Sequence, residues 1–292
     1  MPASAATTLP SGATLTLNAN GTYLYKPNGA FESLDLDEST TDTFTYTISD
    51  GQGGTSTATA TITIDGRNDA PQAGVLPARA SNDGATINLD VGALFGDIDV
   101  EPLTFTISNL PAGLTYDPAT GTISGQITNG SSQLGEFSVP GGSKYLVQVA
   151  ASDGDSEITR TFFFTIVNLP PVAVDDAATA SEDGPSVAGN VLSDASTGDA
   201  DTAPDADPLS VLSAAQGATA FTLGVPFTVS GGGTLTLNPD GGYTFDPGTA
   251  YNGLDAGETA TETIAYTIAD GNGGFDTALL VITKNDGGRI GS

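Results

Sequence analysis

Alternation of apolar and polar residues runs through most of the chain, and its clearest instance is FTYTISDGQGG at residues 44–54. Aromatic and β-branched side chains alternate there with threonines, an Asp-Gly turn follows, and a second alternating run occupies residues 57–64. Because successive side chains of a strand point to opposite faces of a sheet, this pattern predicts a β-hairpin with one buried face. The unit returns as IAYTIADGNGG at residues 264–274 and, altered, as VQVAASDGD at residues 147–155.

An internal repeat links the two ends of the chain. Residues 11–66 align without a gap on residues 231–286 at a constant offset of 220 positions. The second copy has about sixty further residues ahead of it, 171–230, including strand-like runs, whereas the first copy has almost none. The first copy is therefore expected to lack its opening strands and to leave a sheet edge and part of its core open. Two explanations stay open: simple truncation, which we prefer, and a module split by an inserted domain.

The segment between the copies, residues 71–168, reads as a unit of its own. About seven short strands with frequent turns in roughly 100 residues predict an immunoglobulin-like sandwich. In its closing strand, Phe162, Phe164 and Ile166 are expected to face the core, with Phe163 outward. Six of these strands are expected at residues 85–91, 103–108, 114–117, 121–124, 145–151 and 159–167.

These patterns predict an all-β chain of tandem Ig-like β-sandwiches arranged as a rod. We divide it into a first module (residues 1–68, partial), a middle module (69–169) and a last module (170–286, complete). The short linkers that contain proline, 68–71 and 168–171, favour a rod over a globule. Met1 is expected to be a start inside a longer polypeptide, because no signal-peptide pattern follows it. Residues 287–292 are expected to be a tail of vector-encoded residues.

Composition narrows the function. Seven basic against 35 acidic residues give a net charge of −28, which excludes a nucleic-acid partner and disfavours anionic membrane surfaces. The chain has no histidine, so His-based catalytic triads are absent, and it has no cysteine, so no disulfide staples it. No apolar run approaches the ~20 residues of a membrane helix, so membrane insertion is not expected. Two carboxylates could serve a glycosidase, but nothing marks a particular pair, and an enzyme is the least supported class.

The remaining chemistry lies in acidic residues at the module boundaries. Calcium takes 6–8 oxygen ligands from carboxylates, amides and backbone carbonyls. In an Ig-like sandwich the chain start, the B–C loop and the F–G loop share one pole, so these residues should meet at the two junctions, with Asn82 or Asp83 added from the middle module. The candidates at the first junction are Asp65, Asn68, Asp69, Asp97, Asp99, Glu101, Asp153 and Asp155. Those at the second are Asn168, Asp175, Asp176, Asp199, Asp201, Asp205, Asp207 and Asp270.

Simpler interpretations apply to several of these side chains. An Asp before Gly is ordinary turn chemistry, as at Asp50 or Asp183. The acidic loop at residues 199–207 is not an EF-hand, since it lacks the glycine and glutamate of that motif, and a flexible solvated loop is the alternative. Two further acidic groups are expected to be solvated connections: Asp35, Asp37 and Glu38, and their counterparts Asp255, Glu258 and Glu262. The alternating aromatics are expected in the core rather than on a sugar-stacking platform: Tyr23, Tyr25, Tyr243 and Phe245.

Residues 1–66 and 171–286 resemble the VCBS repeats of large bacterial surface proteins. The resemblance rests on the pattern TLTLNxxGxYxYxP, followed by a strand that leads to SDGxGG. Residues 71–168 resemble the cadherin-like or Ig-like modules that alternate with such repeats, through GDIDVEPLTFTISNLPAGLTYDPATGTISG and the closing SDGD. The resemblance implies extender regions of RTX-type (repeats-in-toxin) adhesins, which are exported to the bacterial cell surface and bind Ca²⁺.

Two functions therefore compete. The first is a calcium-stiffened extender segment of a bacterial surface adhesin that supports cell adhesion and biofilm formation. The alternative is a calcium-dependent carbohydrate- or protein-binding module of the same adhesin, which an exposed aromatic pair beside a calcium site would favour. In either case we expect an extracellular monomer whose partners are the neighbouring extender domains, with a surface glycan or a protein as a further ligand.

Overall fold

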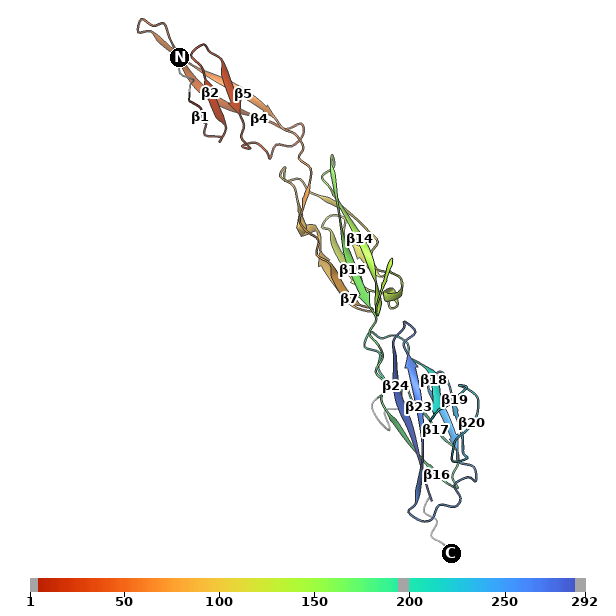
Figure 1. Cartoon of the computed structure of the whole chain (residues 1–292). Helices are drawn as coiled ribbons and strands as arrows, with labels where there is room; N and C mark the ends of the chain where they lie inside the picture. The colour runs from red at the N-terminus through yellow and green to blue at the C-terminus, as the bar shows by residue number, and fades with distance from the viewer. Residues whose placement is uncertain (1–4, 194–199, 287–292) are drawn as a thin grey trace.

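The alternating stretches of the sequence form strands, and these strands build three modules joined end to end in a rod (Figure 1). The structure is a computed structural model that describes residues 5–193 and 200–286. The chain is all-β apart from two short 3-10 helices in the described residues. Within those residues, none of the helices has the length and apolar character needed to cross a membrane.

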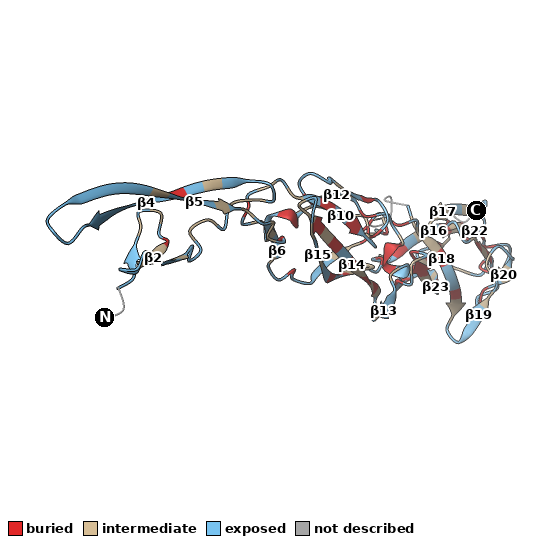
Figure 2. Cartoon of the chain, turned by 90° about the horizontal axis from the view of Figure 1, so that it is seen from above, coloured by how far each residue is buried: buried red, intermediate tan, exposed pale blue. Residues whose placement is uncertain are grey.

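The first module contains a three-stranded sheet and a separate long hairpin. The sheet has the order β1-β2-β3, and β4 pairs antiparallel with β5. Its described residues bury few apolar side chains, Ala13, Leu15 and Phe44, and the hairpin is exposed along most of its length (Figure 2). The bounds are β1 (Thr7–Thr8), β2 (Thr14–Leu17), β3 (Tyr23–Lys26), β4 (Ser39–Ser49) and β5 (Thr55–Asp65).

The middle module is a sandwich of two main sheets, ordered β10-β14-β15-β7, with β13 beside β14, and β11-β12-β8; β6 and β9 pair separately. Phe162, Phe164 and Ile166 are buried and Phe163 is 41% exposed, which confirms the predicted faces. The first six strands are β6 (Gln72–Ala73), β7 (Arg79–Asn82), β8 (Thr86–Asp90), β9 (Phe95–Gly96), β10 (Thr104–Ser108) and β11 (Leu114–Tyr116). They are followed by β12 (Thr122–Gln126), β13 (Phe137–Val139), β14 (Gly142–Ser152) and β15 (Glu157–Val167), and the 3-10 helices are η1 (Gly92–Leu94) and η2 (Ser131–Gln133).

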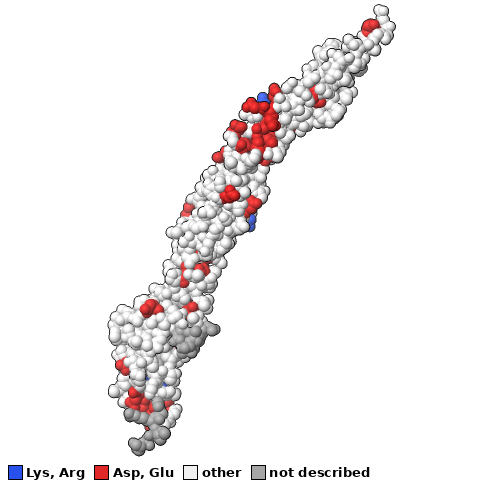
Figure 3. Space-filling model, turned by 180° about the vertical axis from the view of Figure 1, so that it is seen from behind, with Lys and Arg blue, Asp and Glu red and all other residues white. Residues whose placement is uncertain are grey.

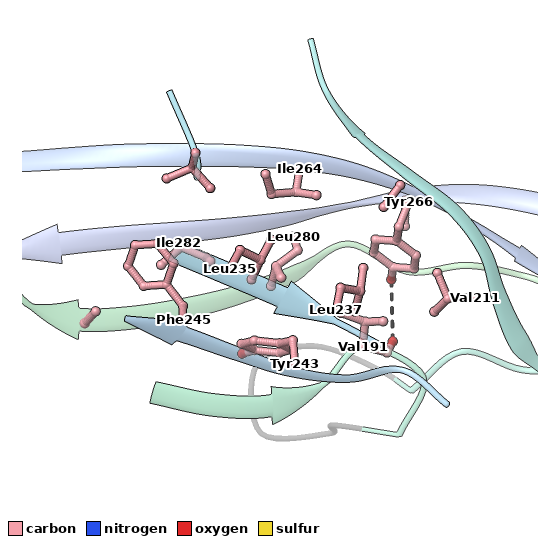
Figure 4. Close-up of a cluster of buried hydrophobic side chains, with 14 of the residues drawn as sticks. Val191, Val211, Leu235, Leu237, Tyr243, Phe245, Ile264, Tyr266, Leu280 and Ile282 are labelled. Atoms are coloured by element: carbon pink, nitrogen blue, oxygen red, sulfur yellow. Dashed lines mark hydrogen bonds between the residues drawn. The ribbon is translucent and has the colours of Figure 1, made fainter. Parts of the chain in front are cut away.

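The last module is a sandwich of a five-stranded sheet, β16-β24-β23-β18-β19, and a four-stranded sheet, β17-β22-β21-β20. Side chains from both sheets interdigitate in one core, where the Tyr266 hydroxyl also bonds the Val191 carbonyl (Figure 4). The first five strands are β16 (Asp176–Ser181), β17 (Val187–Asn190), β18 (Ser210–Gln216), β19 (Thr219–Phe221) and β20 (Phe227–Thr228). The others are β21 (Thr234–Leu237), β22 (Gly242–Asp246), β23 (Thr259–Ala269) and β24 (Phe275–Asn285).

The sequence repeat is also a structural repeat. Strands β1–β5 correspond to β20–β24, and the hairpin registers agree: Phe44 lies opposite Ala60, as Ile264 lies opposite Leu280. The burial of the aligned residues differs, however. Tyr243 and Phe245 are buried as predicted, whereas Tyr23, expected in the core, is 56% exposed.

One acidic residue expected in solvent is instead buried in the core region of the last module. Glu262 is 4% exposed and forms an ion pair of 3.4 Å with Lys284, which is 0% exposed. Its neighbours Asp255 and Glu258 are exposed, as expected. The prediction for Glu262 was wrong because Glu262 shares the inward face of β23 with Ile264 and Tyr266.

Candidate metal sites at the module junctions

The loop between β9 and β10 organises the first junction. The backbone N–H of Asp69, in the linker, donates to Oδ2 of Asp99 at 2.7 Å, and the N–H of Asp99 donates to Oδ1 of Asp97 at 3.1 Å. Val100 adopts a left-handed φ of 69°, which is a sterically costly conformation for a β-branched residue. It lies between Asp99 and Glu101, and those two side chains offer oxygens within 4.8 Å of each other.

The β14–β15 turn adds a carboxylate on the same side. Asn68 Nδ2 donates to Oδ2 of Asp153 at 3.3 Å, which ties the linker to this turn. The other oxygen, Asp153 Oδ1, accepts the N–H groups of Asp155 (2.8 Å) and Ser156 (2.6 Å). Burial alone would raise the pKa of Asp153, but these backbone hydrogen bonds hold it below its ordinary value. Asp153 is therefore an ionised group that orders the turn.

The first module contributes Asp35, which the sequence analysis placed in solvent with Asp37 and Glu38. An Asp35 oxygen lies within 4.8 Å of oxygens of Asp99 and Glu101, so this expectation was wrong for Asp35. A hydrogen bond with Asp35, then desolvation, then the charges of Asp35, Asp99 and Asp97 raise the pKa of Glu101 to about 7. Acidic side chains accordingly gather on the surface where the first and middle modules meet (Figure 3).

The second junction repeats this arrangement with different loops. The N–H of Leu169 donates to Oδ2 of Asp205 at 3.0 Å, as Asp69 does to Asp99. Asn168 Nδ2 donates to Oδ2 of Asp270 at 2.8 Å, as Asn68 does to Asp153. Ala206, the residue after Asp205, has a φ of 63°, matching Val100 after Asp99. By this correspondence, Asp207 occupies the place of Glu101.

The middle module faces Asp207 across the second junction. Asn129 Nδ2 donates to the carbonyl of Ala206 at 3.3 Å, and Gln133 Nε2 donates to the carbonyl of Asn272 at 2.6 Å. Burial raises the pKa of Asp207, a hydrogen bond from Asn272 partly opposes this, and the charges of Asp205, Asp270 and Asp83 raise it further. Asp83 therefore acts on Asp207 from the preceding module, as Asp35 acts on Glu101.

Buried oxygens without a hydrogen-bond partner occur at both junctions. Among the described residues, the buried side-chain polar atoms without a hydrogen-bond partner are all oxygens, four in the segments of the first junction and four at the matching pole of the last module. Buried oxygens without a donor are costly, and a bound cation would satisfy them. They are Asn68 Oδ1, Asp97 Oδ2, Asp99 Oδ1, Glu101 Oε2, Asn168 Oδ1, Asp201 Oδ2, Asp205 Oδ1 and Asp207 Oδ1.

Comparison with protein families identifies the kind of module that carries these clusters. A family described as "Bacterial cadherin-like domain" matches residues 2–66 and 168–286, more than half of the chain. The chain belongs to the bacterial cadherin-like family. Its middle module, residues 70–167, matches a family described as "Putative Ig domain". Cadherin-like domains are of an extracellular adhesion type, generally bind calcium and are typically not enzymes.

Solved structures resemble this cadherin-like chain only distantly. Mouse cadherin-23 EC22-24 is 14% identical with a TM-score of 0.39, covering 92% of this chain and 81% of that one. Mouse protocadherin-24 EC1-3 is 16% identical with a TM-score of 0.36, covering 98% and 94%. A "putative alpha-galactosidase" from Bacteroides fragilis is 18% identical with a TM-score of 0.27, covering 38% of this chain but only 21% of the enzyme's length. Such partial similarity indicates nothing about activity, and no curated protein sequence matches the chain.

Several predicted ligands of this cadherin-like chain lie apart from the clusters. Asp65 and Asp155 are exposed, at the end of β5 and in the β14–β15 turn. Asp175 accepts the N–H of Leu279 at 2.9 Å, and Asp176 accepts the Tyr266 hydroxyl at 2.7 Å, so both tie strands of the last module together. Asp199 lies outside the described residues.

Asp201 belongs to a separate acidic pair. It accepts the N–H of Val174 at 2.7 Å; burial and then the charge of Asp276 raise its pKa, although the Val174 bond lowers it. Sequence reasoning did not find Asp276, the second residue of β24, which is a single acid within that strand.

The metal-free first junction should respond to pH through Glu101. Its raised pKa means that the contribution of the bound proton to stability is fully present below about pH 4.5, and is lost as the pH rises through about 7. We expect the middle module in chelator to melt at a lower temperature at about pH 8 than at about pH 5, and Glu101→Gln to reduce this difference. Calorimetry would measure it, with the exposed Glu157→Gln as the control. A pH profile that Glu101→Gln leaves unchanged would contradict this assignment.

Proposed function

We propose that this chain is a calcium-stiffened extender segment of an RTX-type bacterial surface adhesin, with VCBS-like first and last modules. In this role it holds a binding region away from the cell and so supports cell adhesion and biofilm formation. The observation that carries the proposal is the set of buried, unpartnered oxygens, which gathers at the two junctions and the adjoining pole of the last module. Its immediate partners are the neighbouring domains of the same polypeptide, and the segment acts as an extracellular monomer.

The donor set fits calcium. In the described residues, every buried side-chain polar atom without a partner is a carboxylate or amide oxygen, and Ca²⁺ takes 6–8 such ligands. Soft metals need the histidine or cysteine that this chain lacks. At the first junction Asn68, Asp97, Asp99, Glu101 and Asp35 would hold the ion. At the second, Asn168, Asp205 and Asp207 would hold it, with Asp270 ordering the linker.

Stiffening follows because each cluster draws charge from two modules. Asp35 of the first module faces Glu101 of the middle one, and Asp83 of the middle module faces Asp207 of the last. Without a cation these carboxylates repel one another and push the modules apart. A shared cation replaces that repulsion with attraction on both sides of a short linker, so that the inter-module angle becomes fixed.

The alternative, a sugar- or protein-binding module, has less support. An exposed aromatic pair does exist: Phe137 is 48% and Phe163 41% exposed, with ring centroids 5.8 Å apart. Phe163 lies opposite Leu146, in the middle of the β14–β15 hairpin rather than at the junction ends, and Lys144 covers its ring at 5.6 Å. This placement matches a surface packing cluster rather than a platform beside a calcium site.

Distance distributions across each junction test the proposal. The chain has no cysteine, so cysteines introduced in pairs give specific labels. Exposed positions suit this: Thr45 with Thr106 spans the first junction, and Thr161 with Thr261 the second. We expect single-molecule energy transfer to show a longer mean distance and a narrower distribution in millimolar calcium than in chelator.

Matched variants make the result specific. Asp99→Asn should remove the calcium effect from the first label pair only, whereas Asp155→Asn, an exposed acid of the same junction, should leave it intact. Calorimetric titration must show calcium bound under the same conditions. If calcium binds and the distance distributions neither narrow nor shift to a longer mean distance, the ions stabilise individual loops and do not stiffen the chain.

A further inference from the structure

The buried acids of the last module form two separate groups. Burial raises the pKa of both Asp201 and Asp207, but the charges that raise the two values further are different. The charge of Asp276 acts on Asp201, whereas acids of the second junction and Asp83 act on Asp207. The described acids that act on Asp207 do not include Asp201. The pair of Asp201 and Asp276 therefore lies apart from the junction cluster.

Asp201 has one carboxylate oxygen that nothing satisfies. The residue is 8% exposed, and its Oδ1 accepts the N–H of Val174 at 2.7 Å. Its Oδ2 is buried and has no hydrogen-bond partner among the described residues. A carboxylate oxygen that is withdrawn from water and receives no donor is costly, so this oxygen indicates a ligand that the protein itself does not supply.

Asp276 approaches the same stretch of backbone from β24. Its Oδ2 accepts the N–H of Ala173 at 2.9 Å, so Asp276 and Asp201 accept the consecutive N–H groups of Ala173 and Val174. We call this stretch, residues 172–176, the entry segment of the last module. Asp201 belongs to the loop before β18, so the two carboxylates come from distant parts of the sequence and meet at the entry segment.

The last module has no basic side chain that could balance these acids. Its sequence, residues 170–286, contains one lysine and no arginine. That lysine, Lys284, forms its ion pair with Glu262. The entry segment itself adds the carboxylates of Asp175 and Asp176, so the negative charge around it is larger still. Ions from solution must therefore balance this charge.

We propose that Asp201 and Asp276 form a calcium site within the last module, separate from the second junction. Asp201 Oδ2 and the Asp276 carboxylate would be its charged ligands, and backbone carbonyls and water would complete the 6–8 oxygens that Ca²⁺ takes. The ion would fasten the entry segment to β24 and to the loop before β18, and so protect β16, an edge strand that pairs with β24 alone. This role goes beyond the proposed function, because an ion inside one module fixes no angle between modules.

Counting the calcium ions bound by the full chain tests the proposal. Asp201→Asn keeps an oxygen for the Val174 N–H but removes the charge. In equilibrium dialysis with calcium alone, we expect this variant to bind one ion fewer than the original chain, and the double variant with Asp205→Asn to bind two fewer. Asp246→Asn, at an exposed acid of the same module, is the control and should bind the full number.

Two further measurements separate this site from the junction. In the original chain, millimolar calcium should slow hydrogen exchange in β16 by at least about tenfold, and in Asp201→Asn it should not. The label pair at Thr161 and Thr261 should keep its calcium response in the same variant. Failure of the stiffening role would instead appear as unchanged distances across the junctions in the original chain.

Each result decides the question. If Asp201→Asn folds and binds as many calcium ions as the original chain, or if calcium still protects β16 in it, the site does not exist and water satisfies Asp201. If the variant loses the response of the junction labels, Asp201 is a ligand of the junction and the separate site is wrong. If Asp201→Asn does not fold in calcium, the same measurements on Asp276→Asn decide, with the same expected results.

Discussion

Removing calcium should lower the melting temperatures of the middle and last modules by roughly 10–20 °C each. Extracellular modules commonly bind Ca²⁺ with dissociation constants of about 10⁻⁴–10⁻³ M, so about 10 mM calcium lies up to about 100-fold above them. One site at that excess adds about 2.7 kcal/mol, and about 1 kcal/mol moves the midpoint of a domain of this size by about 4–8 °C. The unpartnered oxygens of both junctions make this a large effect, because they are charged or polar groups that water no longer reaches.

Single substitutions should separate the two junctions. Asp99→Asn keeps a side-chain oxygen for the Asp69 N–H but removes the charge, so it should abolish most of the calcium shift of the middle module. Asp205→Asn should do the same for the last module, through the equivalent bond to Leu169. Asp155→Asn is the matched control. Differential scanning calorimetry in chelator and in calcium would measure all three, and equal melting with and without calcium would refute the metal sites.

The repeat and the strand pattern could be predicted from the sequence because they depend on local rules. Period-two alternation and Asp-Gly turns mark the hairpins, and the offset of 220 positions fixes the correspondence between β4–β5 and β23–β24. The burial of the aromatic residues in one copy does not, however, predict the burial of the aligned residues in the other copy. Tyr23 and Tyr243 occupy equivalent positions, but the strand of Tyr243, β22, has β17 on its second edge, whereas in the described residues β3 pairs with β2 alone.

The residues of the candidate sites that could be predicted are likewise those that depend on local sequence patterns. The D-x-E and D-x-D spacings led to Asp99, Glu101, Asp205 and Asp207 because their ligands lie within one loop. Asp35 was missed, since its role depends on how the first module docks on the middle one, and no pattern within its own module records that contact. Asp175 and Asp176 were assigned to the second junction because the chain start shares a pole of the sandwich with two loops, yet Asp175 bonds Leu279 of β24, and Asp176, the first residue of β16, bonds Tyr266 of β23.

The burial of Glu262 could have been predicted from the period-two alternation of its strand. It alternates with Ile264 and Tyr266 on β23, and Lys284 alternates with Leu280 and Ile282 on β24. An acid and a base on the inward faces of paired strands indicate a buried ion pair. The first module replaces this pair at the equivalent positions with Asp42 and Ile64, and Asp42 accepts the hydroxyls of Ser11 and Tyr25.

Breaking this pair should destabilise the last module strongly. Glu262→Gln should cost about 3–5 kcal/mol, because Lys284 would remain buried without a counter-charge. Glu262 also accepts the hydroxyls of Tyr251 and Ser230, each at 2.9 Å. Burial would raise its pKa, but these bonds, one from Gln216 and the charge of Lys284 hold it below the ordinary value. Burial lowers the pKa of Lys284, and the charge and hydrogen bond of Glu262 oppose this, so removing the carboxylate leaves the burial of the lysine uncompensated.

The double variant shows whether the loss comes from the charge. Glu262→Gln with Lys284→Ile places an apolar residue where the first module has Ile64, and should recover stability to within about 1 kcal/mol of the original. Glu258→Gln, an exposed carboxylate just before β23, is the control and should change stability by less than about 0.5 kcal/mol. Urea unfolding in saturating calcium would keep the junction sites out of the comparison. The single variant could have the same free energy of unfolding as the original chain, or the double variant could be no more stable than the single one. Either result would show that the buried Lys284 does not depend on the charge of Glu262.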